Sequence, residues 1–269
     1  MTTLRDYISE IRKDGYRSFT VDKATKDLGI NRKAVLLKCM RLIQRGELLS
    51  PVKGFYVPIP PEYQEVGSIP PDELIPLVMG YLKYDYYVCL LSAALYHGSS
   101  HQKPQVFQIM TNHRGLKIKS GKRTIKVVYK KTLKDLPLSE YISTTGYLKI
   151  STPELTMVDL LVYLKPSGGL NSVATIFSEL IDAIDVNKLV SLIDLIPQKI
   201  WIQRLGYILE QIDDDDNGKK NKELRQKLAQ YVSEKKCSYI PLAPELPIKG
   251  FRRDKKWKII INTTIEADE

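Results

Sequence analysis

The chain of 269 residues has few cysteines and few histidines, and both shortages limit its chemistry. Its three cysteines lie far apart: Cys39, Cys89 and Cys237. An odd number at such spacings supports neither a disulfide framework nor a zinc site. His97 and His101 are four residues apart, but Gly98 between them disfavours a continuous helix, and no third ligand accompanies them. We therefore expect no metal site and no cofactor.

Long apolar runs and catalytic signatures are also missing. No apolar stretch approaches the ~20 residues that cross a bilayer, and the polar start Met1–Asp6 lacks the apolar core of a signal peptide. We expect a cytoplasmic protein without membrane contact. The sequence has no Walker loop, no Gly-x-Ser-x-Gly elbow and no paired-cysteine motif. Thr156 and Asp159 are three residues apart, a common spacing, and Asp213–Asp216 is best explained as a solvated loop. We therefore expect no enzyme activity.

Positive charge is abundant and unevenly distributed. The chain has 41 Lys and Arg against 31 Asp and Glu, a formal net charge of +10, and a pI near 9.3. Residues 1–58 hold 12 Lys or Arg and 6 Asp or Glu, a net charge of +6, which leaves +4 of the total +10 for the rest of the chain. A small basic segment joined to a less charged body favours an anionic partner, nucleic acid in particular.

The basic segment has the pattern of three helices and a hairpin. Residues 3–13 place one apolar stripe at helical spacing: Leu4, Tyr7, Ile8 and Ile11. We expect a second helix over Asp22–Leu28 with Asp22 as its N-cap, a turn at Gly29-Ile30-Asn31, and a third helix over Arg32–Arg45. A hairpin over Glu47–Val57 turns at residues 51–54. This order predicts a winged helix-turn-helix domain over residues 1–58.

The third helix has an apolar face and a cationic face. The apolar arc should face the core: Val35, Leu36, Cys39, Leu42 and Ile43. The other arc mixes cations with apolar residues, which suits a major groove where apolar groups meet thymine methyls and cations meet phosphate or guanine. The predicted DNA contacts include the helix start and the tip of the hairpin: Asn31, Arg32, Lys33, Ala34, Leu37, Lys38, Arg41 and Lys53. An ordinary exposed face is the alternative, and Tyr56 fits either the core or the contact surface.

Beyond this segment, prolines mark a linker over residues 59–72, and residues 73–269 are expected to form a larger, mixed α/β domain. The expected fold class is thus α+β. Helices are expected from an N-cap at Asp72 to Lys83, over Tyr86–Tyr96, and after a capping box of Ser151 with Glu154. Further helices should continue to about residue 212 and over Lys222–Val232. The expected strands are Val106–Met110, a hairpin over Lys117–Lys131, Tyr147–Ile150 and Trp257–Asn262.

A second cationic stretch lies near the C-terminus. Residues 249–258 interleave six cations with Phe251 and Trp257, a composition suited to a nucleic-acid or acidic-protein surface. The alternative is a solvated loop whose aromatic residues anchor it to the body. The candidate residues of this second basic surface are Lys249, Arg252, Arg253, Lys255 and Lys256.

These segments together resemble a known family. The basic N-terminal segment is followed by YYVCLLSAALYHG at 86–98, HQKPQVFQIM at 101–110, ISTPELTMVDL at 150–160 and WKIIIN at 257–262. This order is similar to that of the AbiEi-type antitoxins of type IV toxin–antitoxin (abortive infection) systems. The similarity extends over nearly the whole chain.

The resemblance implies a protein with two tasks. The winged helix would bind inverted repeats in double-stranded DNA and repress the protein's own operon. The C-terminal domain would counteract a nucleotidyltransferase-like toxin without a stable complex. A nucleic-acid-processing enzyme delivered by a winged helix and a ligand-responsive transcription factor are the alternatives. Because no heptad pattern marks a dimerisation helix, we expect a monomer in solution.

Overall fold

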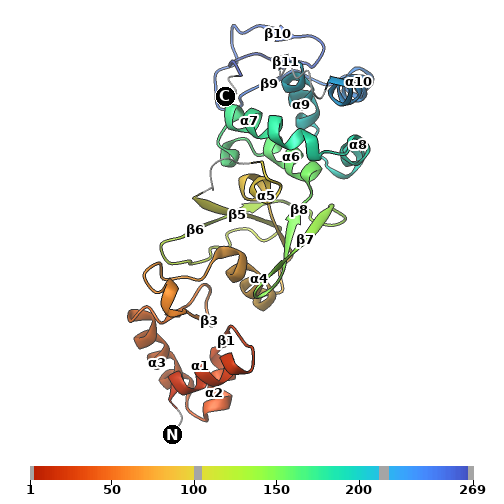
Figure 1. Ribbon diagram of the computed structural model, residues 1–269. Coiled ribbons are helices and arrows are strands. Elements are labelled where there is room, and N and C mark those ends of the chain that lie inside the picture. The colour runs from red at the N-terminus through yellow and green to blue at the C-terminus, as the bar shows by residue number, and fades with distance from the viewer. Residues whose placement is uncertain (1–2, 100–104, 212–217, 266–269) are drawn as a thin grey trace. The chain divides into compact units, whose positions relative to one another are not determined.

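The computed structural model describes residues 3–99, 105–211 and 218–265. They form a mixed α/β protein with helices and several sheets (Figure 1). Two compact units are present: the first contains residues up to 88 with 105–133 and 140–150, and the second contains the rest. No helix in the described part of the chain is long and apolar enough to cross a membrane. The Asp213–Asp216 loop lies outside the described residues.

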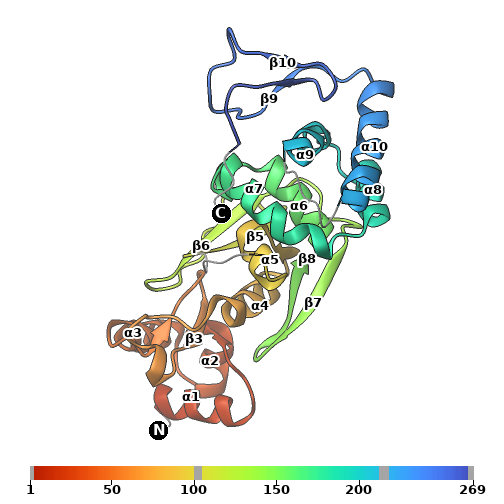
Figure 2. The same cartoon turned by 45° about the horizontal axis from the view of Figure 1, so that its top comes forward.

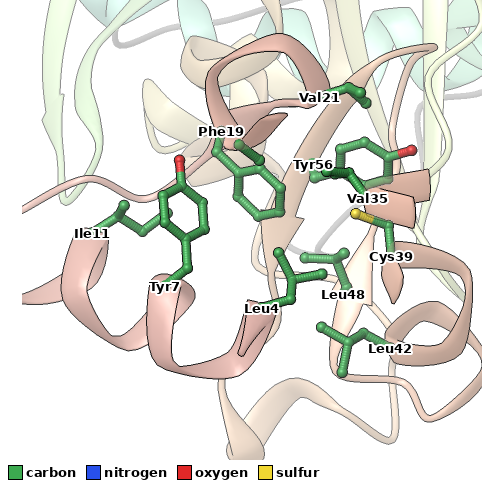
Figure 3. Packing of buried hydrophobic residues seen from close by; sticks show 11 residues of the cluster. Leu4, Tyr7, Ile11, Phe19, Val21, Val35, Cys39, Leu42, Leu48 and Tyr56 are labelled. Carbon is green, nitrogen blue, oxygen red and sulfur yellow. The ribbon is translucent and has the colours of Figure 1, made fainter. Parts of the chain in front are cut away.

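An N-terminal module, residues 3–58, belongs to the first unit. It combines three helices with a three-stranded sheet of order β1-β3-β2: α1 (Leu4–Lys13), β1 (Phe19–Thr20), α2 (Val21–Leu28), α3 (Arg32–Gln44), β2 (Leu48–Leu49) and β3 (Phe55–Pro58). Figure 3 shows that the helices and strands share one core, in which Tyr7, Phe19 and Val35 lie near Leu48 and Tyr56. The expected hairpin is confirmed, because β2 pairs with β3 across the turn at 51–54. The packing of this core determines which side of α3 faces outward.

Local capping signals explain where these helices begin. Thr3 and Asp6 form a capping box at α1, and the Asn31 side chain accepts the Ala34 N–H at 2.8 Å at α3, as expected. The expected cap of α2 is wrong. Thr20 caps this helix by accepting the Lys23 N–H at 3.1 Å, and Asp22 lies in the first turn.

The proline-rich segment 59–72 is partly buried. It contains a short 3₁₀ helix, Pro61–Tyr63, and the side chains of Ile59, Ser68 and Ile69 are buried. Helix α4 (Pro71–Leu82) follows. Its C-cap is Lys83, which agrees with the expected end, but its N-cap is Pro70 rather than Asp72. Proline suits the first turn because the N–H that it lacks has no partner there.

A five-stranded mixed sheet, with strand order β6-β5-β4-β8-β7, lies mostly in the first unit. Its strands are β4 (Tyr86–Val88), β5 (Val106–Thr111), β6 (Thr124–Tyr129), β7 (Leu138–Ser143) and β8 (Gly146–Ser151). Strand β4 is central, antiparallel to β5 and parallel to β8. The strands expected at Val106–Met110 and Tyr147–Ile150 are confirmed.

Two expectations for this region are wrong. The segment Tyr86–Tyr96 is divided into strand β4 and helix α5 (Leu90–Tyr96), where a single helix was expected. The expected hairpin at Lys117–Lys131 is absent from these described residues. Only its second half, β6, is a strand, and β6 pairs in parallel with β5. Strand β7 had no counterpart in the sequence-based prediction.

The second unit is mainly helical. Its helices after α5 are α6 (Pro153–Val162), α7 (Leu170–Leu180), α8 (Val186–Leu195), α9 (Ile200–Gln211) and α10 (Gly218–Glu234). Helix α6 packs against α7 and α9, and α10 packs against α8 and α9 (Figures 1 and 2). The α6 helix starts as expected, but Thr152 is its cap, and the Ser151 hydroxyl instead lies 2.6 Å from that of Thr156.

Three short strands lie in the last part of the described chain. They form a sheet of order β10-β11-β9: β9 (Ile240–Pro241), β10 (Arg253–Asp254) and β11 (Ile259–Ile260). The strand expected at Trp257–Asn262 is thus confirmed only at its centre. Trp257 is fully buried beside this sheet.

Candidate nucleic-acid interface

Helix α3 is held in a fixed orientation by its two ends and its core face. Gly29 ends α2 in the left-handed conformation, with φ of 62°, which glycine adopts without strain. Asn31 then starts α3, and Val35, Cys39 and Leu42 bury one side of the helix (Figure 3). Burial raises the pKa of the Cys39 thiol to about 11, so this thiol is a packing group. The opposite side of α3 therefore faces outward.

The outward face of α3 is cationic with an apolar component. Lys33, Arg41 and Gln44 are exposed, and so are Leu37 at 50% and Met40 at 56%. Ala34 and Lys38 are half-buried at the margin of this face. Two details differ from the expectation: Ile43 is 39% exposed, although it was assigned to the core, and Met40 was not among the predicted contacts. The buried arc of α3 is therefore narrower than the positions of the apolar residues in the sequence predicted.

The cations near α3 differ in their partners. Arg32 forms an ion pair with Asp22 on α2, which neutralises it locally. On α1, Arg5 donates from Nε to Glu47 at 2.9 Å. Within the described residues, Lys33, Lys38 and Arg41 have no ion-pair partner. These three side chains therefore carry the available charge of the α3 face.

The hairpin tip is exposed and anchored. The side chain of Lys53 is exposed, while its carbonyl oxygen accepts a 3.4 Å hydrogen bond from the Tyr81 hydroxyl of α4. Tyr81 also stacks on Phe55, with ring centroids 4.6 Å apart. Tyr56 is 6% exposed and stacks on Phe19 at 5.5 Å. Tyr56 is thus a core residue, which settles the two readings that the sequence left open.

The second basic surface also has a defined anchor. The five cations Lys249, Arg252, Arg253, Lys255 and Lys256 are all exposed, and Phe251 is 44% exposed. Trp257, by contrast, is fully buried, and its backbone N–H donates to Asp254 Oδ1 at 2.6 Å. Trp257 is therefore an anchor, and Phe251 remains on the surface with the cations.

Folding brings further cations to this surface. Lys256 forms an ion pair with Glu210 on α9 and, together with Lys222 and Arg225 of α10, lines a shallow groove. The Arg253 guanidinium lies 5.3 Å from the Tyr239 ring centroid, a cation–π distance. No local pattern predicts this assembly, because α10 and the 249–256 segment are separated along the chain.

Hydrogen bonds from buried or partly buried polar side chains link helices and strands of the second unit. Arg204 is buried on α9 and donates to the Leu161 carbonyl at 2.8 Å and the Pro241 carbonyl at 3.3 Å. Burial lowers the pKa of Arg204 to about 10. His97 Nε2 lies 2.7 Å from the Ser151 carbonyl oxygen, and His101 falls outside the described residues. In the described ranges, no group of three or more His, Cys, Asp or Glu could hold a metal ion.

Comparison with known proteins shows which family part of this chain matches. Residues 86–211 match the family model of the AbiEi antitoxin C-terminal domain. Among curated proteins, none matches this chain. Among solved structures, the chain is similar to the RV2827C protein from Mycobacterium tuberculosis, with a TM-score of 0.63 and 15% identity over 94% of this chain and 89% of that chain. At this identity the likeness shows the fold alone. The expected AbiEi resemblance is confirmed: residues 86–211 belong to the AbiEi antitoxin C-terminal domain family, which supports an antitoxin role in a toxin–antitoxin system.

Proposed function

We propose that residues 1–58 are a winged helix-turn-helix domain that binds double-stranded DNA. The observation that carries this proposal is the outward face of α3, where Lys33, Lys38 and Arg41 have no ion-pair partner in the described residues and lie around an exposed Leu37. The order of three helices and a hairpin supports the same assignment. In this proposal α3 is the recognition helix and the β2–β3 hairpin is the wing.

The chemistry of α3 suits the major groove. Lys33 and Arg41 would bind phosphates or guanine edges, and Leu37 with Met40 would contact thymine methyl groups. Lys53, at the tip of the hairpin, would bind a phosphate. Asn31 contributes its cap, which orients the start of α3, and Arg32 contributes less charge because Asp22 already pairs with it.

We further propose that the protein represses its own operon at inverted repeats and counteracts the operon's nucleotidyltransferase-like toxin. The domain at 86–211 supports the antitoxin part of this proposal. The toxin would be counteracted in the type IV manner, without a stable complex. The second basic surface at 249–256 is then a candidate contact for nucleic acid or for an acidic protein.

DNA binding can be tested with two double variants of the full-length protein. Lys33→Ala with Arg41→Ala should weaken binding to the DNA upstream of the operon by roughly tenfold or more, and should flatten its salt dependence by about one unit of slope for each lost phosphate contact. Fluorescence anisotropy at several salt concentrations measures both quantities.

Lys13→Ala with Lys26→Ala is the matched control, because it removes the same charge from the same module outside α3. This control should keep both the affinity and the salt slope within about twofold of the unmodified protein. Equal losses in the two double variants would show that α3 is not the recognition helix. No binding by the unmodified protein would contradict the proposed function itself.

A further inference from the structure

The two edge strands of the five-stranded sheet differ in how they are protected. Strand β6, at one edge, carries an exposed Lys126 and is flanked by exposed Lys122 and Lys131. Lysine on an edge strand discourages pairing with another chain. Strand β7, at the other edge, contains no lysine, arginine or proline, and its one charged residue is Glu140. The β7 edge thus lacks the protection that the β6 edge has.

Large apolar side chains are exposed at the β7 edge. Ile142 is 76% exposed and Tyr141 is 51% exposed, and Tyr147 on the neighbouring strand β8 is 64% exposed. Because successive residues of a strand point to opposite faces, Tyr141 and Ile142 make the edge apolar on both sides of the sheet. An exposed, apolar edge strand is a template for another strand.

The hairpin that presents this edge is held in place. A two-residue turn at Thr144 and Thr145 joins β7 to β8, and the Ser143 hydroxyl donates to the Gly146 carbonyl at 2.8 Å. The Thr145 hydroxyl donates to the Glu73 carbonyl of α4 at 2.7 Å. The edge is therefore preformed, which lowers the entropic cost of adding a strand.

We propose that β7 is a homotypic contact, through which a second copy of this chain extends the sheet by antiparallel β7–β7 pairing. Such a contact has a two-fold axis, so the strand must be complementary to itself. An axis at Tyr141 places Glu140 opposite Ile142, and an axis between Glu140 and Tyr141 places those two residues opposite each other. In both registers the carboxylates avoid each other and an apolar side chain is covered.

The size of the contact sets its strength. One short strand and its neighbouring side chains cover far less than the ~1,600 Å² of a standard interface, so the dimer is weak, with a dissociation constant in the micromolar range. The expectation of a monomer rested on the lack of a helical heptad, and pairing of sheet edges requires none. Burial of Tyr141, Ile142 and Tyr147 supplies the apolar part of the association.

Sedimentation equilibrium of the full-length protein over a range of concentrations tests this proposal. The unmodified protein should pass from monomer to dimer, and Ile142→Lys should raise the dissociation constant at least about tenfold, because it places a charge at the pairing edge. Thr124→Lys adds the same charge to an exposed position of the opposite edge strand, β6, and should leave the constant unchanged. Thermal melting of both variants checks that each is folded.

Cysteine trapping gives a second, independent measurement. Tyr141→Cys places thiols near the proposed axis at Cα separations of antiparallel neighbours, within disulfide range. Oxidation should therefore link two copies of this variant and should not link Thr124→Cys. The oxidised unmodified protein controls for Cys237, the half-buried native thiol.

Three results would overturn the proposal. The first is a monomer at every concentration, including the case in which β7 is covered only by a different protein. The second is a dimer that Ile142→Lys leaves intact. The third is equal weakening by Ile142→Lys and Thr124→Lys, which would show that added charge, and not the β7 edge, controls association.

Discussion

Gly206 occupies a position on α9 where the structure leaves no space for a side chain. A Cβ atom there would lie 2.0–2.3 Å from three ring carbons of Trp257. Trp257 is fully buried, and Gln203 on the same helix donates to its carbonyl oxygen at 3.1 Å. The indole thus lies directly on the backbone of α9. This close contact fixes the start of the last strand relative to the helix.

Gly206→Ala should destabilise the second unit. The added methyl group must displace the Trp257 ring, and overpacking of this kind costs about 1–3 kcal/mol in the free energy of unfolding, or more where the neighbour cannot move. Both tryptophans of the chain, Trp201 and Trp257, are buried in this unit. Urea denaturation followed by tryptophan emission therefore reports its unfolding directly.

Gly80→Ala is the matched control for this prediction. Gly80 also lies inside a helix, α4, but a Cβ atom there has no other atom within 4 Å. The substitution should stabilise the first unit by about 0.5–1 kcal/mol, since alanine has the higher helix propensity. Circular dichroism is the measurement, because the first unit contains no tryptophan. A destabilised Gly80→Ala, or an unchanged Gly206→Ala, would contradict the argument.

Single residues show how far sequence reasoning reaches. Asn31, Gly29 and Cys39 were predicted correctly because capping, positive φ and burial depend on local pattern. Met40 was missed because an apolar residue in a helix is normally assigned to the core, and Ile43 was misassigned for that reason. The sequence left two roles open for Trp257, since nothing local shows that Gly206 offers space for its ring.

At the scale of elements, α2 shows how a strand decides where a helix starts. Thr20 and Asp22 are both favourable N-cap residues. Thr20 is also the last residue of β1, which pairs with Phe55 of β3 and holds Thr20 extended before the first turn. Its hydroxyl accepts the Lys23 N–H at 3.1 Å, whereas Asp22 pairs with Arg32.

Thr20→Ala should therefore lower the free energy of unfolding by about 1 kcal/mol through loss of the cap. Asp22→Ala should change the stability less, because an exposed ion pair contributes only about 0–1 kcal/mol. Asp22→Ala should also remove the ion-pair partner of Arg32, so that the free guanidinium strengthens the proposed DNA binding. Thermal denaturation compares the two variants, and anisotropy measures the second effect. A larger loss of stability in Asp22→Ala would restore Asp22 as the cap.

Two features of the sheet were misassigned, each for a physical reason of its own. Tyr86–Val88 is a central strand with all three residues buried, so it lacks the alternation that identifies a strand with one solvated face. In Thr124–Tyr129 the strand itself was predicted correctly. Its partner, however, is β5, in a parallel arrangement that no local turn encodes. Local pattern thus predicts elements better than it predicts which strands pair.

At the scale of the whole molecule, the basic module shares the first unit with part of the matched domain, whose remaining residues lie in the second unit. Residues up to 88 form one compact unit with β5 and β6, whereas the AbiEi match covers residues 86–211. A truncation at residue 73, the predicted domain boundary, would divide this unit. Point substitutions on α3 are therefore the better means of separating the proposed DNA binding from the antitoxin role.

The proposed function predicts that the full-length double variant Lys33→Ala with Arg41→Ala loses repression of the operon and keeps antitoxin activity. Both side chains are exposed and lie outside residues 86–211, so their removal should leave the matched domain intact. We expect a promoter reporter to rise several-fold, approaching its level without the protein, because roughly tenfold weaker binding empties the operator. Growth in the presence of the toxin should remain at the level given by the unmodified protein.

Protein level decides how this experiment is interpreted. The Lys13→Ala with Lys26→Ala variant, expressed to the same level, should keep both repression and rescue. If the α3 variant lost rescue at equal expression, α3 would contribute to neutralisation itself, and the two tasks would not be separable by position. If it kept repression, the charge of the α3 face would be irrelevant to the operator, and the recognition surface would have to be sought elsewhere, beginning with the cations at 249–256.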